Sequence, residues 1–179
     1  MIQLQPFRPE DIPRLVNWIN LPSLLVQWTG NTFEYPFTAE QYREYFQKAH
    51  QRQNATFIWK AVLLPGKKVI GHVELCDINL NDRTARVARM FVIPEEQGKG
   101  YGTQIMQKVL DAGFEKLGLK KILLNVLIFN LPAIACYKKV GFSVEETLKN
   151  RVRIGDKLWS TYRMSISREE WEQVVRDDF

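Results

Sequence analysis

A short glycine-rich run, from Gln97 to Gly102, is the part of the sequence whose residue types point most directly to chemistry. It follows the apolar strand pattern Val87–Ile93 and opens a strongly amphipathic helix. Glycines let the backbone turn sharply and let a ligand approach its N–H groups, while the following helix offers unpaired amides and the positive end of its dipole. The pattern therefore predicts a phosphate-binding loop and a cofactor that carries a pyrophosphate.

Two other kinds of phosphate loop do not fit these residues. A dinucleotide fingerprint needs the spacing GxGxxG, but Thr103 or Ile105 stands where the third glycine should be. The nucleoside-triphosphate loop needs GxxxxGK and then Ser or Thr, and its nearest frame, Gly113–Gly118, is followed by Leu119 and Lys120. NAD and ATP are therefore both disfavoured as ligands.

The glycine run instead resembles the Q/RxxGxG/A loop of the GNAT superfamily of acyl-CoA-dependent N-acyltransferases, which Gln97, Gly100 and Gly102 match in order. Downstream, at the distance expected of a βαβ unit, Asn130–Phe142 resembles that superfamily's NxxAIxxYxKxGF segment. Within the superfamily the chain is similar to the branch that contains ribosomal-protein N-terminal acetyltransferases and some aminoglycoside N-acetyltransferases.

The resemblance implies a site for acetyl-CoA as co-substrate, with no metal. Backbone groups near the end of one strand would pair with the pantetheine arm, and the loop amides would hold the pyrophosphate. The residues expected to contact the cofactor are Phe91, Val92, Gln97, Gly98, Lys99, Gly100, Tyr101, Gly102, Thr103, Asn130, Ala133 and Lys138. Core packing for Phe91 and Val92, an N-cap for Asn130 and a solvated side chain for Lys138 are the alternatives.

Tyr137 is the candidate for a catalytic acid. Expulsion of CoA as a thiolate is assisted by a nearby proton donor, and a phenol with an ordinary pKa of about 10 stays protonated at neutral pH. The spacing of Asn130, Ala133 or Ile134, and Tyr137 places them on one helix face, which would look towards the cofactor thiol. A packed aromatic side chain is the alternative, and the resemblance favours the acid.

A base or a water chain is also needed, because the attacking amine must be neutral. Many members of the superfamily place a glutamate on the strand after the long helix, where this sequence has Asn125, and an amide cannot accept a proton. Glu74, on the central hairpin, is the substitute candidate. A surface or ion-paired carboxylate is the alternative for Glu74, and proton removal through ordered water would leave no motif.

His72, Glu74 and Cys76 share a strand face, as a covalent acyl-transfer site or a metal site would require. His72 and Cys76, however, are separated by about 13 Å along a strand, which is beyond hydrogen-bond reach. Zinc needs three or four converging nitrogen or sulfur ligands, and the sequence has no CxxC or HxxxH spacing. Cys–His chemistry and metal catalysis are therefore disfavoured.

The elements that must position these residues follow from the hydrophobic pattern. Strands are expected over Ile2–Phe7, Phe57–Leu64, Val69–Cys76, Thr84–Ile93, Lys121–Leu127, Phe142–Thr147 and Lys157–Met164, and helices over 12–19, 38–51, 102–117 and 130–141. The apolar strand Lys121–Leu127 is expected to be buried on both faces. With the resemblance, the pattern predicts an α+β fold with a mixed, mostly antiparallel central sheet that is splayed near the middle and flanked by helices.

At 179 residues the chain is long enough for one domain, and a single N-acetyltransferase domain is expected over 1–179. The resemblance is close over 69–164, the acyl-CoA-binding core, and looser over 1–64, the substrate side. The sequence shows no secretory signal and no apolar run near the ~20 residues of a membrane span. Two cysteines suit a reducing compartment, so we expect a cytoplasmic protein without a membrane partner.

The reaction that the resemblance implies is direct transfer of acetyl from the thioester to a primary amine, on a protein N-terminus or a small molecule. The segments expected to select the acceptor are Asn20–Phe37 and the last hairpin, where Lys149, Arg151 and Arg153 alternate. These three residues also fit a solvated edge strand. A polycationic antibiotic would prefer an acidic pocket, and the net charge of +5 disfavours such an acceptor, although Glu34, Asp77 and Asp82 could make a pocket locally acidic.

A non-catalytic module that senses acyl-CoA, or docks on nucleic acid through its basic hairpin, is the alternative function. The intact glycine loop and Tyr137 favour turnover, so a nucleic-acid partner is not expected. The sequence leaves open the acceptor, the base, the acyl chain and a homodimer.

Overall fold

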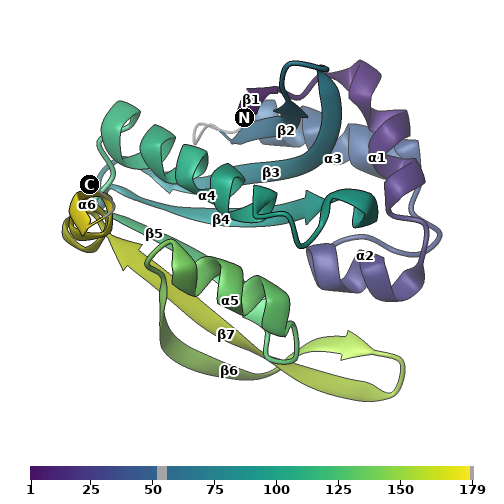
Figure 1. Ribbon diagram of the computed structural model, residues 1–179. Helices are drawn as coiled ribbons and strands as arrows, with labels where there is room; N and C mark the ends of the chain where they lie inside the picture. The colour runs from purple at the N-terminus through teal and green to yellow at the C-terminus, as the bar shows by residue number, and fades with distance from the viewer. Residues whose placement is uncertain (52–55, 178–179) are drawn as a thin grey trace.

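One sheet organises the protein (Figure 1). The computed structural model describes residues 1–51 and 56–177, and seven strands of these residues pair in the order β1-β2-β3-β4-β5-β7-β6. The strands are β1 (Ile2–Pro6), β2 (Phe57–Leu63), β3 (Lys68–Asn79), β4 (Thr84–Val92), β5 (Lys121–Leu127), β6 (Ser143–Ile154) and β7 (Lys157–Ser167). Neighbouring strands are antiparallel except β4 and β5, which are parallel. The expected mixed, mostly antiparallel sheet is confirmed.

Helices cover both faces of the sheet. They are α1 (Ile12–Trp18), α2 (Pro22–Thr29), α3 (Ala39–Gln51), α4 (Tyr101–Asp111), α5 (Leu131–Lys139) and α6 (Arg168–Asp177). Figure 1 shows α4 and α5 on one face and α3 behind the other, where it packs against α1. Within residues 1–51 and 56–177, no helix combines the length and the apolar character that a bilayer crossing requires.

The splay lies between the two parallel strands. β4 and β5 pair only over Thr84–Val87 and Lys121–Leu124, although both strands continue beyond these residues. The two strands meet near α6 and diverge towards α2 (Figure 1). The splay expected near the middle of the sheet is therefore confirmed, and it leaves the second half of each strand free to line a site.

A β-bulge in β4 adjoins the splay. Glu74 pairs with Ala88 and His72 pairs with Phe91, so two steps along β3 face three along β4. Arg89 takes up the extra length with a φ of 50°. A bulge bends its strand and re-aims the neighbouring side chains, which is common beside active sites.

One expectation about β5 is wrong. The strand is not buried on both faces, because Asn125 is exposed and Leu123 is half-buried. Ile122, Leu124 and Val126 are buried and face the core. Buried and more exposed side chains alternate along β5, because the second face of the strand opens onto the splay.

Candidate active site

The larger of two cavities beside the splay has a volume of about 680 Å³ and lies between the end of β4, the glycine loop and α5. We call it the α5 groove. It brings together ten of the predicted site residues: Phe91, Val92, Gln97, Gly98, Gly100, Gly102, Thr103, Asn130, Ala133 and Tyr137. Most of the predicted cofactor contacts therefore converge on one cavity.

The glycine loop has the open backbone that a phosphate ligand needs. Gly98 and Gly100 have φ values of 74° and 79°, in the left-handed region that favours glycine. A Cβ built on either residue would meet no other atom within 4 Å, so the space in front of the loop is free. Gly100 is the N-cap residue of α4, whose first amides and dipole attract an anion. The loop therefore fits a pyrophosphate.

Three predicted cofactor contacts do not line the α5 groove. Lys99 forms an ion pair with Glu96, with 2.9 Å between Nζ and Oε2. Tyr101 packs against the hydrophobic core, and Lys138 is exposed on α5, while Lys139 lines the groove in its place. Their positions give no direct support to the predicted contacts.

The end of β4 presents backbone groups to the groove. The Phe91 side chain is 6% exposed and packs against Trp18 with 5.9 Å between ring centroids, so it belongs to the core. The Val92 carbonyl accepts a hydrogen bond of 2.7 Å from Gln97 Nε2. A strand-like ligand would therefore meet the backbone of these two residues and not their side chains.

Tyr137 lies on α5, is half-buried and lines the α5 groove. Burial raises the pKa of its hydroxyl, and the neighbouring Cys136 adds to the shift, so the phenol stays protonated well above neutral pH. Within the described part of the chain the hydroxyl has no hydrogen-bond partner.

Asn130 Oδ1 accepts a hydrogen bond of 3.4 Å from Ala133 N, which confirms its role as the N-cap of α5 and fixes the start of the helix.

Glu74 lies at the centre of a buried network. Its Oε1 accepts a hydrogen bond of 3.0 Å from the Tyr42 hydroxyl and lies 3.1 Å from His72 Nε2. Its Oε2 pairs with an Arg89 guanidinium nitrogen at 2.9 Å and accepts a hydrogen bond from the Tyr45 hydroxyl. Glu74 and His72 are fully buried.

The surroundings make this carboxylate a weak base. Burial alone would raise the pKa of Glu74, but the Arg89 charge, His72 and Tyr45 outweigh it and lower the pKa to about 2. Glu74 lines neither cavity of the splay. The geometry therefore favours the ion-paired interpretation of Glu74 over the role of base.

Among the described residues, those around the same strand do not assemble a covalent or metal site. Cys76 Sγ contacts the Arg86 carbonyl at 3.4 Å, and burial raises the pKa of this thiol to about 11. His72 is engaged by Glu74 and Tyr42. Residues 1–51 and 56–177 contain no group of three or more His, Cys, Asp or Glu that could hold a metal ion.

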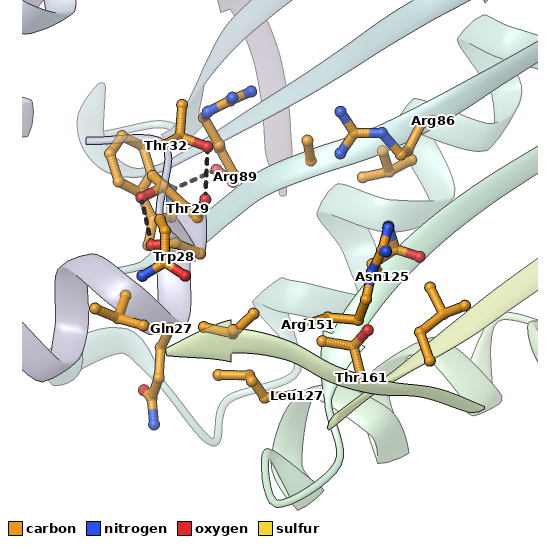
Figure 2. A pocket seen from close by; sticks show the side chains of 17 residues that line it. Gln27, Trp28, Thr29, Thr32, Arg86, Arg89, Asn125, Leu127, Arg151 and Thr161 are labelled. Atoms are coloured by element: carbon orange, nitrogen blue, oxygen red, sulfur yellow. Dashed lines mark hydrogen bonds between the residues drawn. The ribbon is translucent and has the colours of Figure 1, made fainter. Parts of the chain in front are cut away.

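A smaller cavity of about 270 Å³ lies on the other side of the splay, between α2, β4, β5 and the β6–β7 hairpin (Figure 2). We call it the α2 cavity. Asn125 and Thr161 line it from β5 and β7, and Arg86 and Arg151 line it from β4 and β6. Sequence reasoning missed Arg86 and Thr161, which carry no local signal.

The two cavities share Gln27 and Trp28 of α2. Trp28 Nε1 donates a hydrogen bond of 2.7 Å to the carbonyl of Arg89, the bulge residue of β4 (Figure 2). The indole is therefore fixed where the α5 groove meets the α2 cavity. Two reactants that entered from opposite sides would meet at this point.

The comparisons with known proteins fit this geometry. A family model described as an acetyltransferase (GNAT) domain matches residues 2–143. The chain belongs to this family. It is an N-acetyltransferase with acetyl-CoA as co-substrate and a primary amine as acceptor, as the two motifs implied.

Individual relatives are similar over almost the whole chain. The spermidine N(1)-acetyltransferase of Escherichia coli (strain K12) is 33% identical over 172 residues, which cover 95% of this chain and 88% of the relative. YdaF of Bacillus subtilis (strain 168), provisionally named a ribosomal N-acetyltransferase, is 25% identical over 96% of this chain and 93% of its own.

The same fold occurs in a solved structure. The crystal structure of spermidine N-acetyltransferase from Vibrio cholerae in complex with CoA and spermine matches with a TM-score of 0.83 and 28% identity. The match covers 96% of this chain and 98% of that chain. These relatives support an enzyme over a non-catalytic binding module.

Proposed function

We propose that acetyl-CoA binds in the α5 groove, that a small primary amine binds in the α2 cavity, and that acetyl passes directly between them. The observation that carries the proposal is the pair of cavities that meet at Gln27 and Trp28. Direct transfer requires both reactants at one point in a fixed orientation, and such positioning supplies much of the rate enhancement.

The chain's own groups would hold the donor. The free backbone of the glycine loop and the first turn of α4 suit the pyrophosphate, and the backbone of Phe91 and Val92 suits the amide-containing arm. Thr103, at the start of α4, lines the groove and could add a side-chain contact. Acetyl-CoA supplies the activated thioester.

Tyr137 would act at the leaving sulfur. The amine nitrogen forms a bond to the acetyl carbon, the carbon–sulfur bond breaks, and Tyr137 Oη delivers its proton to the departing thiolate. Its raised pKa keeps the hydroxyl in the protonated form across the neutral range.

Water in the α2 cavity would carry away the proton of the amine. Asn125 cannot accept a proton, and the residues that line this cavity in the described chain include no Asp or Glu. Glu74 is too weak a base and lies outside the cavity. Proton removal through water needs no side-chain base.

Two observations favour a small acceptor over a protein N-terminus. The α2 cavity has a volume of only about 270 Å³. Its edge is tied down, because the Asn31 side chain donates to the Arg153 carbonyl and accepts from the Arg153 amide, both at 3.0 Å. The relatives named for spermidine also have small-molecule acceptors in their names.

The cytoplasm is the proposed location. Cys76 and Cys136 are both free thiols, which a reducing compartment maintains.

The substitution Tyr137→Phe tests the assignment. We expect kcat for CoA release to fall about 100-fold, because general acid catalysis is lost, with little change in acetyl-CoA affinity by calorimetry. Tyr35→Phe is the control, because Tyr35 is exposed and, although it lies in the segment expected to select the acceptor, lines neither cavity. An unchanged kcat with chemistry rate-limiting would remove Tyr137 from this role, and no affinity for CoA or its acylated forms would remove the proposed function.

A further inference from the structure

We propose that the acceptor amine carries an acidic group, a carboxylate or a phosphate, which Arg151 and Arg86 bind in the α2 cavity. The inference rests on the proposed function, in which this cavity holds the acceptor. The charged residues that line this cavity have the opposite sign to those that a polyamine would require.

Arginine is the only charged residue type that lines the α2 cavity in the described chain, at positions 86, 89 and 151. A polyamine such as spermidine carries several ammonium groups and no anion. Like charges brought together in a binding site are strongly unfavourable, and a polycation would need carboxylates in its place. The cavity therefore suits an acceptor with negative charge.

The three arginines are not equally available. The Arg89 guanidinium is held by Glu74 and by the Tyr45 hydroxyl, at 2.9 and 3.0 Å, and Figure 2 shows it turned away from the cavity. The charge of Arg89 is therefore neutralised inside the core, and Arg89 contributes only its backbone to the cavity wall. Arg89 therefore adds little attraction for a ligand.

Arg86 and Arg151 keep donors for a ligand. Arg86 donates from Nε to Asp77 Oδ2 at 2.7 Å, and neither of its terminal nitrogens forms a hydrogen bond with a described residue. Arg151 forms no ion pair and no side-chain hydrogen bond with any described residue. Figure 2 shows the Arg151 side chain rising from β6 into the cavity, with Arg86 on the wall formed by β4. Two such forks match the planar oxygens of a carboxylate or phosphate.

An irregularity of β6 places Arg151 there. Leu148 pairs with Thr161 and Val152 pairs with Trp159, so four steps along β6 face two along β7. Asn150, inside this bulge, has a φ of 54°. Successive side chains of a regular strand point to opposite faces, yet Arg151 and Val152 both line the cavity. The bulge thus brings Arg151, an exposed residue of the edge strand β6, to the rim of the cavity.

The neutral wall residues complete a site for an amino acid-like molecule. Asn125 and Thr161 line the same cavity, and an amide and a hydroxyl can each accept a hydrogen bond from an amine. The small volume, about 270 Å³, favours a short acceptor in which the amine and the acidic group are separated by a few bonds. The acidic end would face the arginines and the amine would face Trp28.

The test compares matched amines. CoA release is measured with saturating acetyl-CoA and three kinds of amine. The acidic amines are β-alanine and phosphoethanolamine, the neutral amine is ethanolamine, and the cationic amines are ethylenediamine and spermidine. For each short amine, a homologue with a four-carbon chain is also measured. We expect kcat/KM for the acidic amines to exceed that for the neutral and cationic amines by about 10- to 100-fold, the range of a charge-assisted hydrogen bond. A preference for the phosphate or for the carboxylate identifies which acid is bound.

Two variants locate the effect. Arg151→Gln should lower the ratio of kcat/KM for an acidic amine to kcat/KM for ethanolamine by about tenfold or more. Arg153→Gln changes a nearby exposed arginine that does not line the cavity, so this ratio should not change. Arg151→Glu should shift the preference towards ethylenediamine.

The outcomes separate the two proposals. Turnover of ethylenediamine or spermidine at a kcat/KM equal to or above that of the acidic amines would overturn the present inference and leave the proposed function intact. An unchanged ratio in Arg151→Gln would do the same. Absence of turnover for every amine would remove the proposed function and this inference with it.

Discussion

The substitution Glu74→Gln removes the negative charge at the centre of the buried network and keeps the size of the side chain. Arg89, whose side chain is 10% exposed, is then left without its counter-ion. Breaking a buried ion pair by removing one partner costs about 3–5 kcal/mol of unfolding free energy. The pKa gives a second magnitude: a fall from 4.5 to about 2 on folding corresponds to about 3 kcal/mol at neutral pH.

The direction of the pH dependence follows from the lowered pKa. The contribution of Glu74 is complete well above pH 4.5, the pKa in the unfolded chain, and is lost as the pH falls towards the folded value of about 2. By pH 3.5 the native protein should have lost about 1.5 kcal/mol of it. The variant has no carboxyl group at this position to titrate, so the difference in stability between the two proteins should narrow.

Urea unfolding followed by tryptophan fluorescence at pH 7.5 and pH 3.5 measures this difference. Glu34→Gln, which changes an exposed carboxylate, is the control and should leave stability nearly unchanged at both pH values. A Glu74→Gln penalty that is the same at both pH values would refute the reasoning. A penalty no larger than that of Glu34→Gln would refute it as well.

Two further substitutions test the positioning of the site. Gly71→Ala would place a Cβ 2.5 Å from the Phe91 carbonyl oxygen, so we expect the unfolding free energy to fall by about 1–3 kcal/mol and acetyl-CoA to bind more weakly. Gly66→Ala is the control, because a Cβ at Gly66 meets nothing within 4 Å. Equal effects of the two substitutions would contradict the steric argument. Trp28→Phe loses the hydrogen bond to the Arg89 carbonyl, and the KM values for acetyl-CoA and for the amine should each rise about fivefold in steady-state assays. Unchanged KM values for both substrates would exclude the indole from the meeting point of the cavities.

Local signals predicted most of the fold. Thr38 caps α3, because the Gln41 amide donates to its hydroxyl at 3.3 Å, and Asn130 caps α5 in the same manner. Helix α6 was not predicted, although a signal was present. Ser167 and Glu170 form a reciprocal capping box, with hydrogen bonds of 2.7 and 3.2 Å, and this spacing would have indicated the helix start.

The two cavities of the site differ in how far local sequence signals could predict them. The α5 groove was largely predictable because its residues lie in two short motifs whose backbone conformations are local. The α2 cavity was predictable only in part. The segment Asn20–Phe37 and the last hairpin do contribute to its lining, as expected, but Arg86 and Thr161 come from β4 and β7 and reach the cavity only where β4 and β5 part. That separation depends on the pairing of the whole sheet. Glu74 was placed on the correct strand, but its burial depends on helix α3, which supplies Tyr42 and Tyr45.

The shared wall at Trp28 also bears on which acyl groups the enzyme can transfer. An acyl chain longer than acetyl would extend past the indole and enter the space that the amine needs, since the same side chain borders both cavities. The acyl chain of the donor and the acceptor amine would then share the same limited space beside Trp28. A propionyl or butyryl donor should compete with the acceptor, so discrimination against long thioesters needs no pocket of its own.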